Sequence, residues 1–313
     1  MIEARAVRSS CLALSIVVVR FAFLGSVGLG CSLQRLAVDQ TAGIIVAAAP
    51  AIQQEGDFEY ARQALPAGLV QVQGLWQVAP DNEDLLLQLA SGYAAYALVF
   101  LEDEMEAAAD DPDEYARRER RVTRFFLRSR RYGLRLVEQQ NEGFRAALKG
   151  GHSDVRAYLS ERDEDDVPAL FWTSYAWGAA IGHSLDDIEL IADIPTVLTL
   201  MERVAELDGS YQGGGVHTFL GSVYAGIGEA VGGDPEKGKR HFEKALRQQR
   251  RRDLLALVQY AKTYCVNTQN REKFRALLRE VIDAPDYREN RLVNTAAKRR
   301  ARRLLAREDE LFY

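Results

Sequence analysis

ELDGSYQGGGVHTFLGSVYAGIGEAVGGDPEKGKRHFEKAL, residues 206–246, is the stretch of sequence that decides the fold. Within it, Gly221 is followed one helical turn later by Tyr224, and Phe242 is followed in the same way by Ala245. Small residues at this spacing let two helices approach closely, while the aromatic rings fill the space between them. We therefore expect all four residues to be buried together at one helix–helix contact.

This spacing is typical of a tetratricopeptide (TPR) repeat, a pair of antiparallel helices that stacks on its neighbours. Ala261 and Tyr264 repeat the first half of the pattern, and Phe274 and Leu277 repeat the second half. A third unit, around Gly92, is degenerate. Repeats this imperfect predict a compact, all-α, TPR-like superhelical bundle rather than a long regular solenoid.

The segment Leu85–Leu101 is apolar nearly all round. Its apolar run is interrupted by the polar residues Gln88 and Ser91 and by Gly92, which has no side chain. Its length is at the lower limit for a membrane span. Its Ala, Gly and Tyr content and the acidic residues at both ends favour a buried central helix instead.

The composition of the 313-residue chain suits a globular protein, since 47% of its residues are hydrophobic and 27% are charged. The formal net charge of −5 does not favour nucleic-acid binding. Basic residues cluster in 117–131 and 299–307. Such clusters predict solvated helix faces or internal ion-pair partners, with a partner-docking surface as the alternative.

No motif demands catalysis, and we expect no enzyme, no metal and no cofactor. The four histidines are too scattered for a metal signature: His152, His183, His217 and His241. Residues 233–239 have the spacing of a phosphate-binding loop, but Arg240 stands where a hydroxyl would bind Mg²⁺, and a helix precedes the motif. Asp186 and Asp187 are better explained as helix caps than as an acid/base pair.

Two groups of residues form a candidate binding site, and the first is aromatic: Trp172, Tyr175 and Trp177. Packing in the core is one explanation for them. However, the aromatic residues here cannot all share one core-facing stripe of a helix. The sharper interpretation is an aromatic wall of a groove, where amphipathic rings meet an apolar or mixed ligand.

The second group surrounds three glycines that precede a helix: Asp208, Tyr211, Gly214 and His217. Glycines expose the backbone N–H groups of a helix N-terminus, an arrangement that favours an anion or a carboxylate. The alternative is a flexible loop between repeats, with His217 packed at a helix contact. Because the two groups lie within a few helices of each other, we expect them to border one concavity.

Residues 1–30 predict a signal peptide of the lipoprotein type, with Cys31 as the lipidated residue and the only membrane anchor. Basic residues precede an apolar stretch that ends in Gly-Leu-Gly immediately before this cysteine. Gly28 stands where a larger aliphatic residue is usual, and Arg20 interrupts the apolar core. An ordinary cleaved leader or a later translation start are therefore alternatives. We expect residues 31–313 to form a single all-helical domain.

Several blocks of the sequence resemble the T-component family of TRAP transporters, the tripartite ATP-independent periplasmic transporters. These blocks are LLLQLASGYAAYALVF (85–100), LFWTSYAWGAAIG (170–182), LDGSYQGGGVHTFLG (207–221), GGDPEKGKRHFEKAL (232–246) and NRLVNTAAKRRARRLL (290–305). They occur in family order, so the resemblance covers nearly the whole chain from about Cys31 to Phe312.

The resemblance implies a periplasmic lipoprotein that serves as a non-enzymatic accessory component of a TRAP transporter. The implied partner is the transporter's extracytoplasmic solute-binding protein, and a homo-oligomer that holds or channels a small solute is a further implication. The alternative from another class is a stand-alone periplasmic carrier of a small apolar or carboxylate ligand. An enzyme that uses Asp186, Asp208 or His217 is the least supported alternative.

Overall fold

The structure is a computed structural model that describes residues 35–229 and 232–313. Cys31 and the predicted signal peptide, residues 1–30, lie outside the described residues. Within the described residues the secondary structure is helical, with no strand. The predicted all-α fold is confirmed.

The described part of the chain begins with an N-terminal helix, Arg35–Gln53, and continues through helices joined by short connections. In order these are α2 (Phe58–Val78), α3 (Glu83–Tyr96), α4 (Glu102–Ala107), α5 (Pro112–Gln140), α6 (Phe144–Gly150), α7 (His152–Ser160), α8 (Val167–Gly182), α9 (Ile188–Ile191), α10 (Ile194–Asp208), α11 (Tyr211–Gly226), α12 (Pro235–Gln248), α13 (Leu254–Tyr260), α14 (Arg271–Asp283), α15 (Arg291–Ala306) and α16 (Glu308–Leu311). The described chain also has two π-helical turns. The first, η1 (Ala97–Leu101), connects α3 to α4, and the second, η4 (Ala261–Cys265), follows α13.

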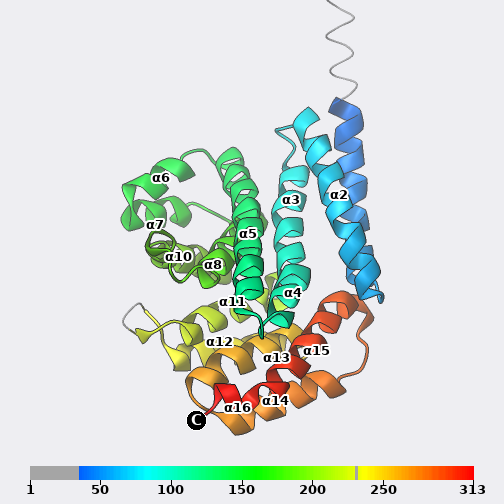
Figure 1. Cartoon of the computed structure of the whole chain (residues 1–313). Helices are drawn as coiled ribbons and strands as arrows, with labels where there is room; N and C mark the ends of the chain where they lie inside the picture. The colour runs from blue at the N-terminus through cyan, green and yellow to red at the C-terminus, as the bar shows by residue number, and fades with distance from the viewer. Residues whose placement is uncertain (1–34, 230–231) are drawn as a thin grey trace, which may run out of the picture.

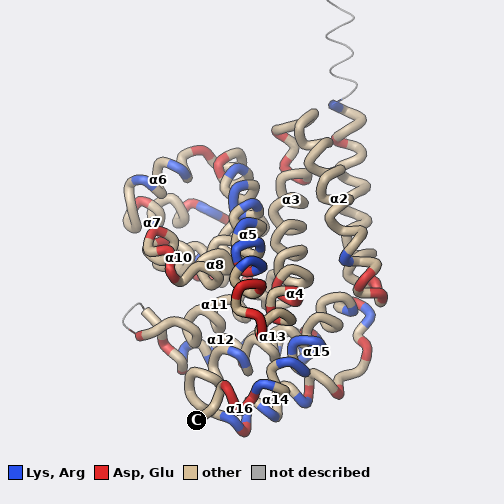
Figure 2. Tube along the Cα trace, in the orientation of Figure 1, with Lys and Arg blue, Asp and Glu red and all other residues tan. Residues whose placement is uncertain are grey.

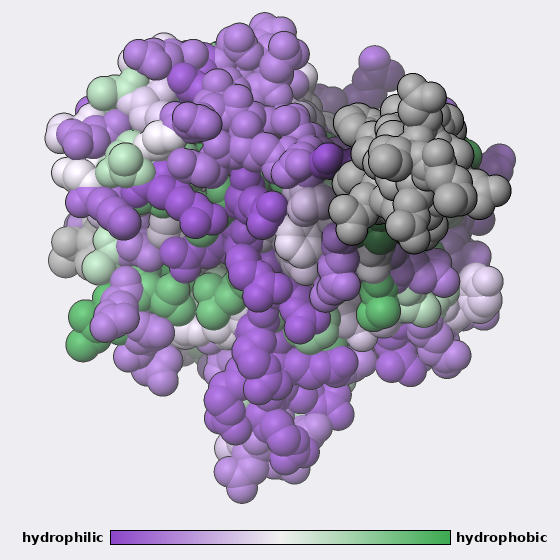
Figure 3. All heavy atoms as spheres, turned by 90° about the horizontal axis from the view of Figure 1, so that it is seen from above, coloured by the Kyte–Doolittle hydropathy of each residue, from purple (hydrophilic) through white to green (hydrophobic). Residues whose placement is uncertain are grey.

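The long helices of the first half stand side by side, and the C-terminal helices lie across one end of them (Figure 1). Helix α3 packs against α2 and α5, α5 packs against α8, and α8 packs against α10. In the C-terminal part α11 pairs with α12, and α15 contacts α13 and α14 as well as α2 and α4. Seen from above, the exposed surface is mostly hydrophilic, with hydrophobic residues showing only in places (Figure 3).

Helix α3 is the buried central helix that the sequence predicts. Leu85, Leu86 and Leu89 have no exposed surface, and the π-helical turn that follows is also buried. By length and composition, two helices of the described chain could cross a membrane, Arg35–Gln53 and Glu83–Ala107. Most of the second is buried inside the protein, whereas most of the first is exposed.

The α11–α12 pair brings two of the four repeat residues, Gly221 and Phe242, into contact. A Cβ atom on Gly221 would lie 2.9 Å from Cγ of Phe242, so any side chain there would collide with this ring. Phe242 and Ala245 have no exposed surface, and Tyr224 is nearly buried. Phe242 in turn stacks on Tyr260 of α13, with ring centroids 4.7 Å apart. These contacts are consistent with TPR-like packing.

Residues 233–239, which have the spacing of a phosphate-binding loop, form the N-terminal end of helix α12. The Asp234 side chain accepts a hydrogen bond from the backbone N–H of Lys237, and Pro235 occupies the first turn of α12. Gly238 lies so close to α11 that a Cβ atom would be 2.9 Å from the carbonyl oxygen of Gly221. Gly238 therefore serves the contact between α11 and α12.

Candidate ligand cavity

A cavity of about 1250 Å³ lies between the N-terminal helix, α2, α3, α8, α11, α13 and α15. This volume exceeds the ~300–1,000 Å³ that is usual for small-molecule sites. Its walls are mainly aliphatic and aromatic, with side chains from distant parts of the sequence: Ile45, Leu69, Val99, Phe219, Leu255 and Leu292. The cavity therefore offers a large apolar chamber inside a helical body.

Trp172, Tyr175 and Tyr211, which belong to the two predicted groups, line this cavity, together with backbone from Gly213 and Gly215. The ring of Phe171 contacts all three of these rings. It meets the ring of Trp172 edge-on with centroids 5.0 Å apart and that of Tyr211 with centroids 5.1 Å apart, and it stacks on Tyr175. One aromatic wall thus joins α8 to the start of α11.

Trp177, by contrast, is not among the cavity-lining residues. It is 3% exposed, donates a hydrogen bond from Nε1 to Oδ2 of Asp193 at 3.0 Å, and lies under the guanidinium of Arg130, 3.8 Å from the ring centroid. Two residues along a helix correspond to a rotation of about 200°. Trp177 therefore points to the opposite side of α8 from Tyr175 and belongs to the core.

The three-glycine segment differs from the simple helix start that the sequence suggests. Gln212, Gly213 and Gly214 have positive φ values of 51°, 63° and 89°, so a left-handed turn interrupts α11 near its start. The backbone N–H of Gly214 donates to the carbonyl of Ser210 at 2.9 Å, so it is not free for an anion. Asp208 accepts hydrogen bonds from the backbone and hydroxyl of Ser210 and closes this turn.

His217 is also directed away from the cavity. It is 2% exposed, and its Nδ1 lies 3.0 Å from Nδ1 of His241 on α12. One imidazole must be the donor and the other the acceptor in this contact, so at least one ring is neutral there. His217 thus contacts α12 and Asp208 caps the turn after α10, and neither lines the cavity.

The charged part of the cavity is where η4 faces α4. Lys262 on η4, Glu102 on α4 and Asp253 at the start of α13 are the charged residues among the described residues that line the cavity. Lys262 Nζ lies 3.3 Å from Oε1 of Glu106, and 41% of the lysine side chain is accessible. Lys262 thus borders both the cavity and Glu106.

The comparisons with known proteins agree with the resemblance seen in the sequence. A model of the TRAP transporter T-component family matches residues 54–312. The chain belongs to the TRAP transporter T-component family. It is also similar to an uncharacterized protein of Treponema pallidum (strain Nichols), with 29% identity over 264 residues that cover 83% of this chain and 81% of that protein.

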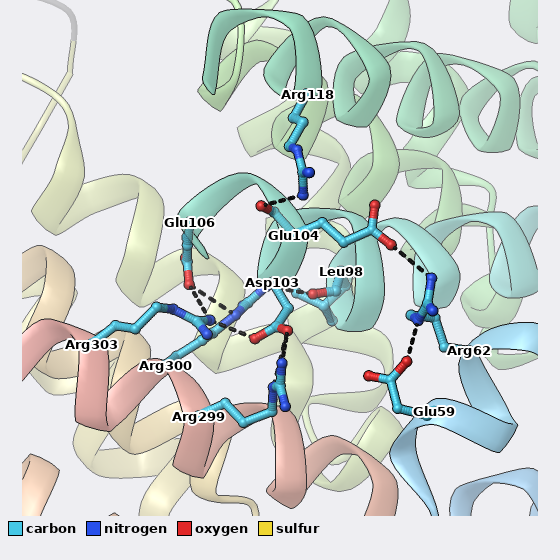
Figure 4. Close-up of polar contacts among 10 residues, drawn as sticks. All are labelled: Glu59, Arg62, Leu98, Asp103, Glu104, Glu106, Arg118, Arg299, Arg300 and Arg303. Atoms are coloured by element: carbon cyan, nitrogen blue, oxygen red, sulfur yellow. Dashed lines mark hydrogen bonds and ion pairs between the residues drawn. The ribbon is translucent and has the colours of Figure 1, made fainter. Parts of the chain in front are cut away.

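Within this T-component, a buried ion-pair cluster lies behind the cavity wall, where acidic α4 meets basic α15 (Figures 2 and 4). Arg300 is 2% exposed, and its guanidinium lies 2.8 Å from Oε2 of Glu102 and 3.4 Å from Oε2 of Glu106. It also donates to the carbonyl of Leu98 in the π-helical turn η1. Asp103 pairs with Arg299 at 3.0 Å and with Arg303. The basic cluster at 299–307 therefore includes internal ion-pair partners, one of the three predicted explanations.

The pKa values of the carboxylates reflect this pairing. Burial alone would raise the pKa of Glu106, but Arg300 and other nearby cations outweigh burial and hold that pKa at about 2. The pKa of Glu102 is lowered in the same way, because Arg300 and His183 more than offset its burial. The Glu106 carboxylate in turn raises the pKa of Lys262. The T-component thus holds both glutamates ionised and Lys262 protonated beside the cavity.

Among the described residues, no group of three or more His, Cys, Asp or Glu side chains is placed to hold a metal ion. Cys265 is buried, and burial raises the pKa of its thiol to about 12. Such a thiol stays protonated and is a poor nucleophile.

The histidine pair gives a testable pH dependence. Burial, with nearby Lys244 for His217 and nearby Lys237 for His241, lowers the pKa of each histidine from 6.5 to about 4. Between pH 6.5 and pH 4 the unfolded chain therefore binds more protons than the folded T-component. We expect the free energy of unfolding to fall as pH decreases through this window.

Urea denaturation at a series of pH values measures this effect. The His217→Gln/His241→Gln double variant, which removes both imidazoles, should show a shallower pH slope than wild type between pH 6.5 and pH 4. His152→Gln, at an exposed position, is the control for loss of an imidazole. Equal slopes for the double variant and wild type would show that this pair does not contribute.

The cavity residues that the sequence prediction missed had a weak signal. Gln88 and Ser91 interrupt an otherwise apolar helix, and both line the cavity. Ser91 donates to the Leu87 carbonyl of its own helix, so its hydroxyl is satisfied beside the chamber. A polar residue inside an all-apolar helix of this T-component therefore marks the face toward the cavity. No comparable signal marked Lys262, which follows an ordinary apolar run.

Proposed function

We propose that this protein is a periplasmic, non-enzymatic accessory component of a TRAP transporter. In this role it docks the transporter's extracytoplasmic solute-binding protein and holds or channels a small solute. The observation that carries the proposal is the apolar cavity of about 1250 Å³ in a member of the T-component family. A chamber of this size has room for a small solute.

The chemistry of the site supports a binding role over a catalytic one. The imidazole of His217 is buried against His241, and Asp208 is committed to a turn. Glu102 accepts from His183 at 3.1 Å and pairs with Arg300. The groups that would act as bases in an enzyme are therefore engaged in holding helices together.

Complex formation with the solute-binding protein encoded beside the transporter's membrane subunits tests the docking role. We expect the two purified proteins to elute together in size-exclusion chromatography, with binding measurable by isothermal titration calorimetry. Light scattering on the same sample gives the number of copies of each chain and so tests a homo-oligomer. Absence of a complex, with solute present or absent, would favour the stand-alone carrier instead.

We further propose that residues 1–30 are removed and that Cys31 carries a lipid that holds the protein at a bacterial membrane. The supporting observation is the basic and apolar leader that ends in Gly-Leu-Gly before the cysteine. Mass spectrometry of the native N-terminus should find an acylated Cys31 and membrane-bound protein, and Cys31→Ser should release it. An unmodified N-terminus downstream of residue 31 would contradict lipidation.

A further inference from the structure

The outward face of helix α5 carries a row of arginines. These residues, which we call the arginine stripe, recur every three or four positions: Arg117, Arg121, Arg124, Arg128, Arg131 and Arg135. Side chains at this spacing share one face of a helix, and the rise from the first to the last is about 27 Å. Figure 2 shows basic residues along the length of α5. All of them are arginines, since the helix contains no lysine.

The helices beside the stripe supply no negative charge along most of its length. Helix α5 packs against α3 on one side and α8 on the other. Neither residues 85–101 nor α8 contains a charged residue, and residues 63–80, which include most of α2, contain none either. The charge of the stripe is therefore not balanced by its neighbours in the fold.

The C-terminal part of the stripe has no carboxylate partner. Arg121, near the N-terminal end, contacts Glu104 at 3.2 Å. Among the described residues, the four arginines that follow it in the stripe form no ion pair with a carboxylate: Arg124, Arg128, Arg131 and Arg135. The first three of these are exposed. Because like charges on adjacent turns repel one another, an anionic partner would stabilise this face.

A row of aromatic rings lies beneath the same arginines. Four rings, each in contact with the next, form this aromatic row: Phe125, Tyr93, Tyr132 and Trp76. Cζ of Arg128 lies 5.1 Å from the ring centroid of Tyr93, and Cζ of Arg135 lies 5.0 Å from that of Trp76. Arg131 lies over Tyr132 in the same way. These cation–π contacts restrict the guanidinium groups, so less side-chain entropy is lost when a partner binds.

The composition of this surface favours a protein over a lipid bilayer as the anionic partner. Protein–protein interfaces are enriched in arginine and aromatic residues and depleted in lysine, and here an all-arginine stripe lies beside half-buried Trp76 and Phe125. An anionic membrane surface attracts lysine and arginine alike. A planar guanidinium also donates two parallel hydrogen bonds to one carboxylate, which a lysine ammonium does not. The surface therefore fits aspartate and glutamate side chains of a protein.

We propose that the arginine stripe of α5 is the docking surface for an acidic face of the transporter's solute-binding protein. This inference rests on the proposed function, in which that protein docks on the T-component, and it names the face and the chemistry of the contact. Carboxylates of the partner supply the negative charge that α3 and α8 lack. Arg124, Arg128 and Arg131 make the central contacts.

Charge reversal tests the proposal on the purified protein. We expect the Arg124→Glu/Arg128→Glu/Arg131→Glu variant to lose at least about thirtyfold in affinity for the solute-binding protein, because three attractions become repulsions. The Arg145→Glu/Lys149→Glu/Arg156→Glu variant is the matched control. It makes the same change in net charge at exposed positions on α6 and α7, and its affinity should stay within about threefold of wild type. Isothermal titration calorimetry measures the affinities, and circular dichroism checks that both variants are folded.

Salt dependence gives a second readout. Raising the salt concentration should weaken the wild-type complex more than the complex of the stripe variant, since salt screens the attraction that the variant has lost. If the stripe variant bound as tightly as wild type, this docking face would be overturned while the docking role of the proposed function stands. Absence of any complex with the wild-type protein would overturn both.

Two other occupants of the stripe are distinguished by separate measurements. In the Cys31→Ser background, the stripe variant could lose sedimentation with phosphatidylglycerol vesicles yet keep full affinity for the solute-binding protein, which would assign the stripe to a membrane surface. Light scattering could instead show a changed number of copies at unchanged affinity, which would assign it to a contact between copies of this chain. Either result would overturn the proposal.

Discussion

Replacing Arg300 with methionine is expected to lower the free energy of unfolding by about 3–5 kcal/mol, the usual cost of removing one partner from a buried ion pair. Arg300 is 2% exposed and lies between Glu102 and Glu106, which are themselves largely buried. Without the guanidinium, the buried carboxylate of Glu102 keeps only His183 as a partner, and that of Glu106 keeps only Arg303 and Lys262. The carbonyl of Leu98 in the π-helical turn η1 loses a donor as well.

Urea denaturation followed by circular dichroism measures this loss. Arg302→Met is the matched control, because it removes the same group from an exposed position on the same helix. Adding Glu102→Gln to Arg300→Met should recover part of the lost stability, since it removes one of the stranded charges. If Arg300→Met unfolded at the same urea concentration as Arg302→Met, the buried network would not be holding α4 and α15 together.

The sequence predicted the features of the fold that depend on local pattern. Helix propensity, caps and apolar periodicity are local, so the all-α class and the burial of α3 follow from neighbouring residues. The contact of Gly221 with Phe242 also follows from a short repeat pattern. The ion pairs of Arg300 could not be derived in this way, because its partners lie about 200 residues earlier in the chain.

The cavity was predicted only in part, for a related reason. Its aromatic wall comes from two neighbouring segments, which the sequence could associate through Trp172, Tyr175 and Tyr211. Its other walls come from the N-terminal helix, α2, α3 and α15, and no local signal says that these helices enclose a chamber. Similarly, the π-helical turns that place Lys262 and Glu102 result from packing rather than from a sequence motif.

The two tryptophans of α8 illustrate the difference between an aromatic residue that packs and one that faces a ligand. Trp177→Ala is expected to lower the free energy of unfolding by about 3–5 kcal/mol, because it leaves a void in the core and removes the hydrogen bond to Asp193. Trp172→Ala removes a partly exposed ring from the cavity wall, so it should cost much less stability. Urea denaturation of the two variants measures this contrast.

Binding of dodecanol, used as an apolar probe of the cavity, should show the reverse order. Trp172→Ala is expected to weaken it about tenfold, which corresponds to about 1.4 kcal/mol of lost contact. Folded Trp177→Ala should bind dodecanol within twofold of wild type, since Trp177 does not touch the chamber. If Trp177→Ala instead weakened binding more than Trp172→Ala at equal folded fraction, the ligand would occupy the opposite side of α8. In that case the aromatic wall described here would serve only the packing of the helices.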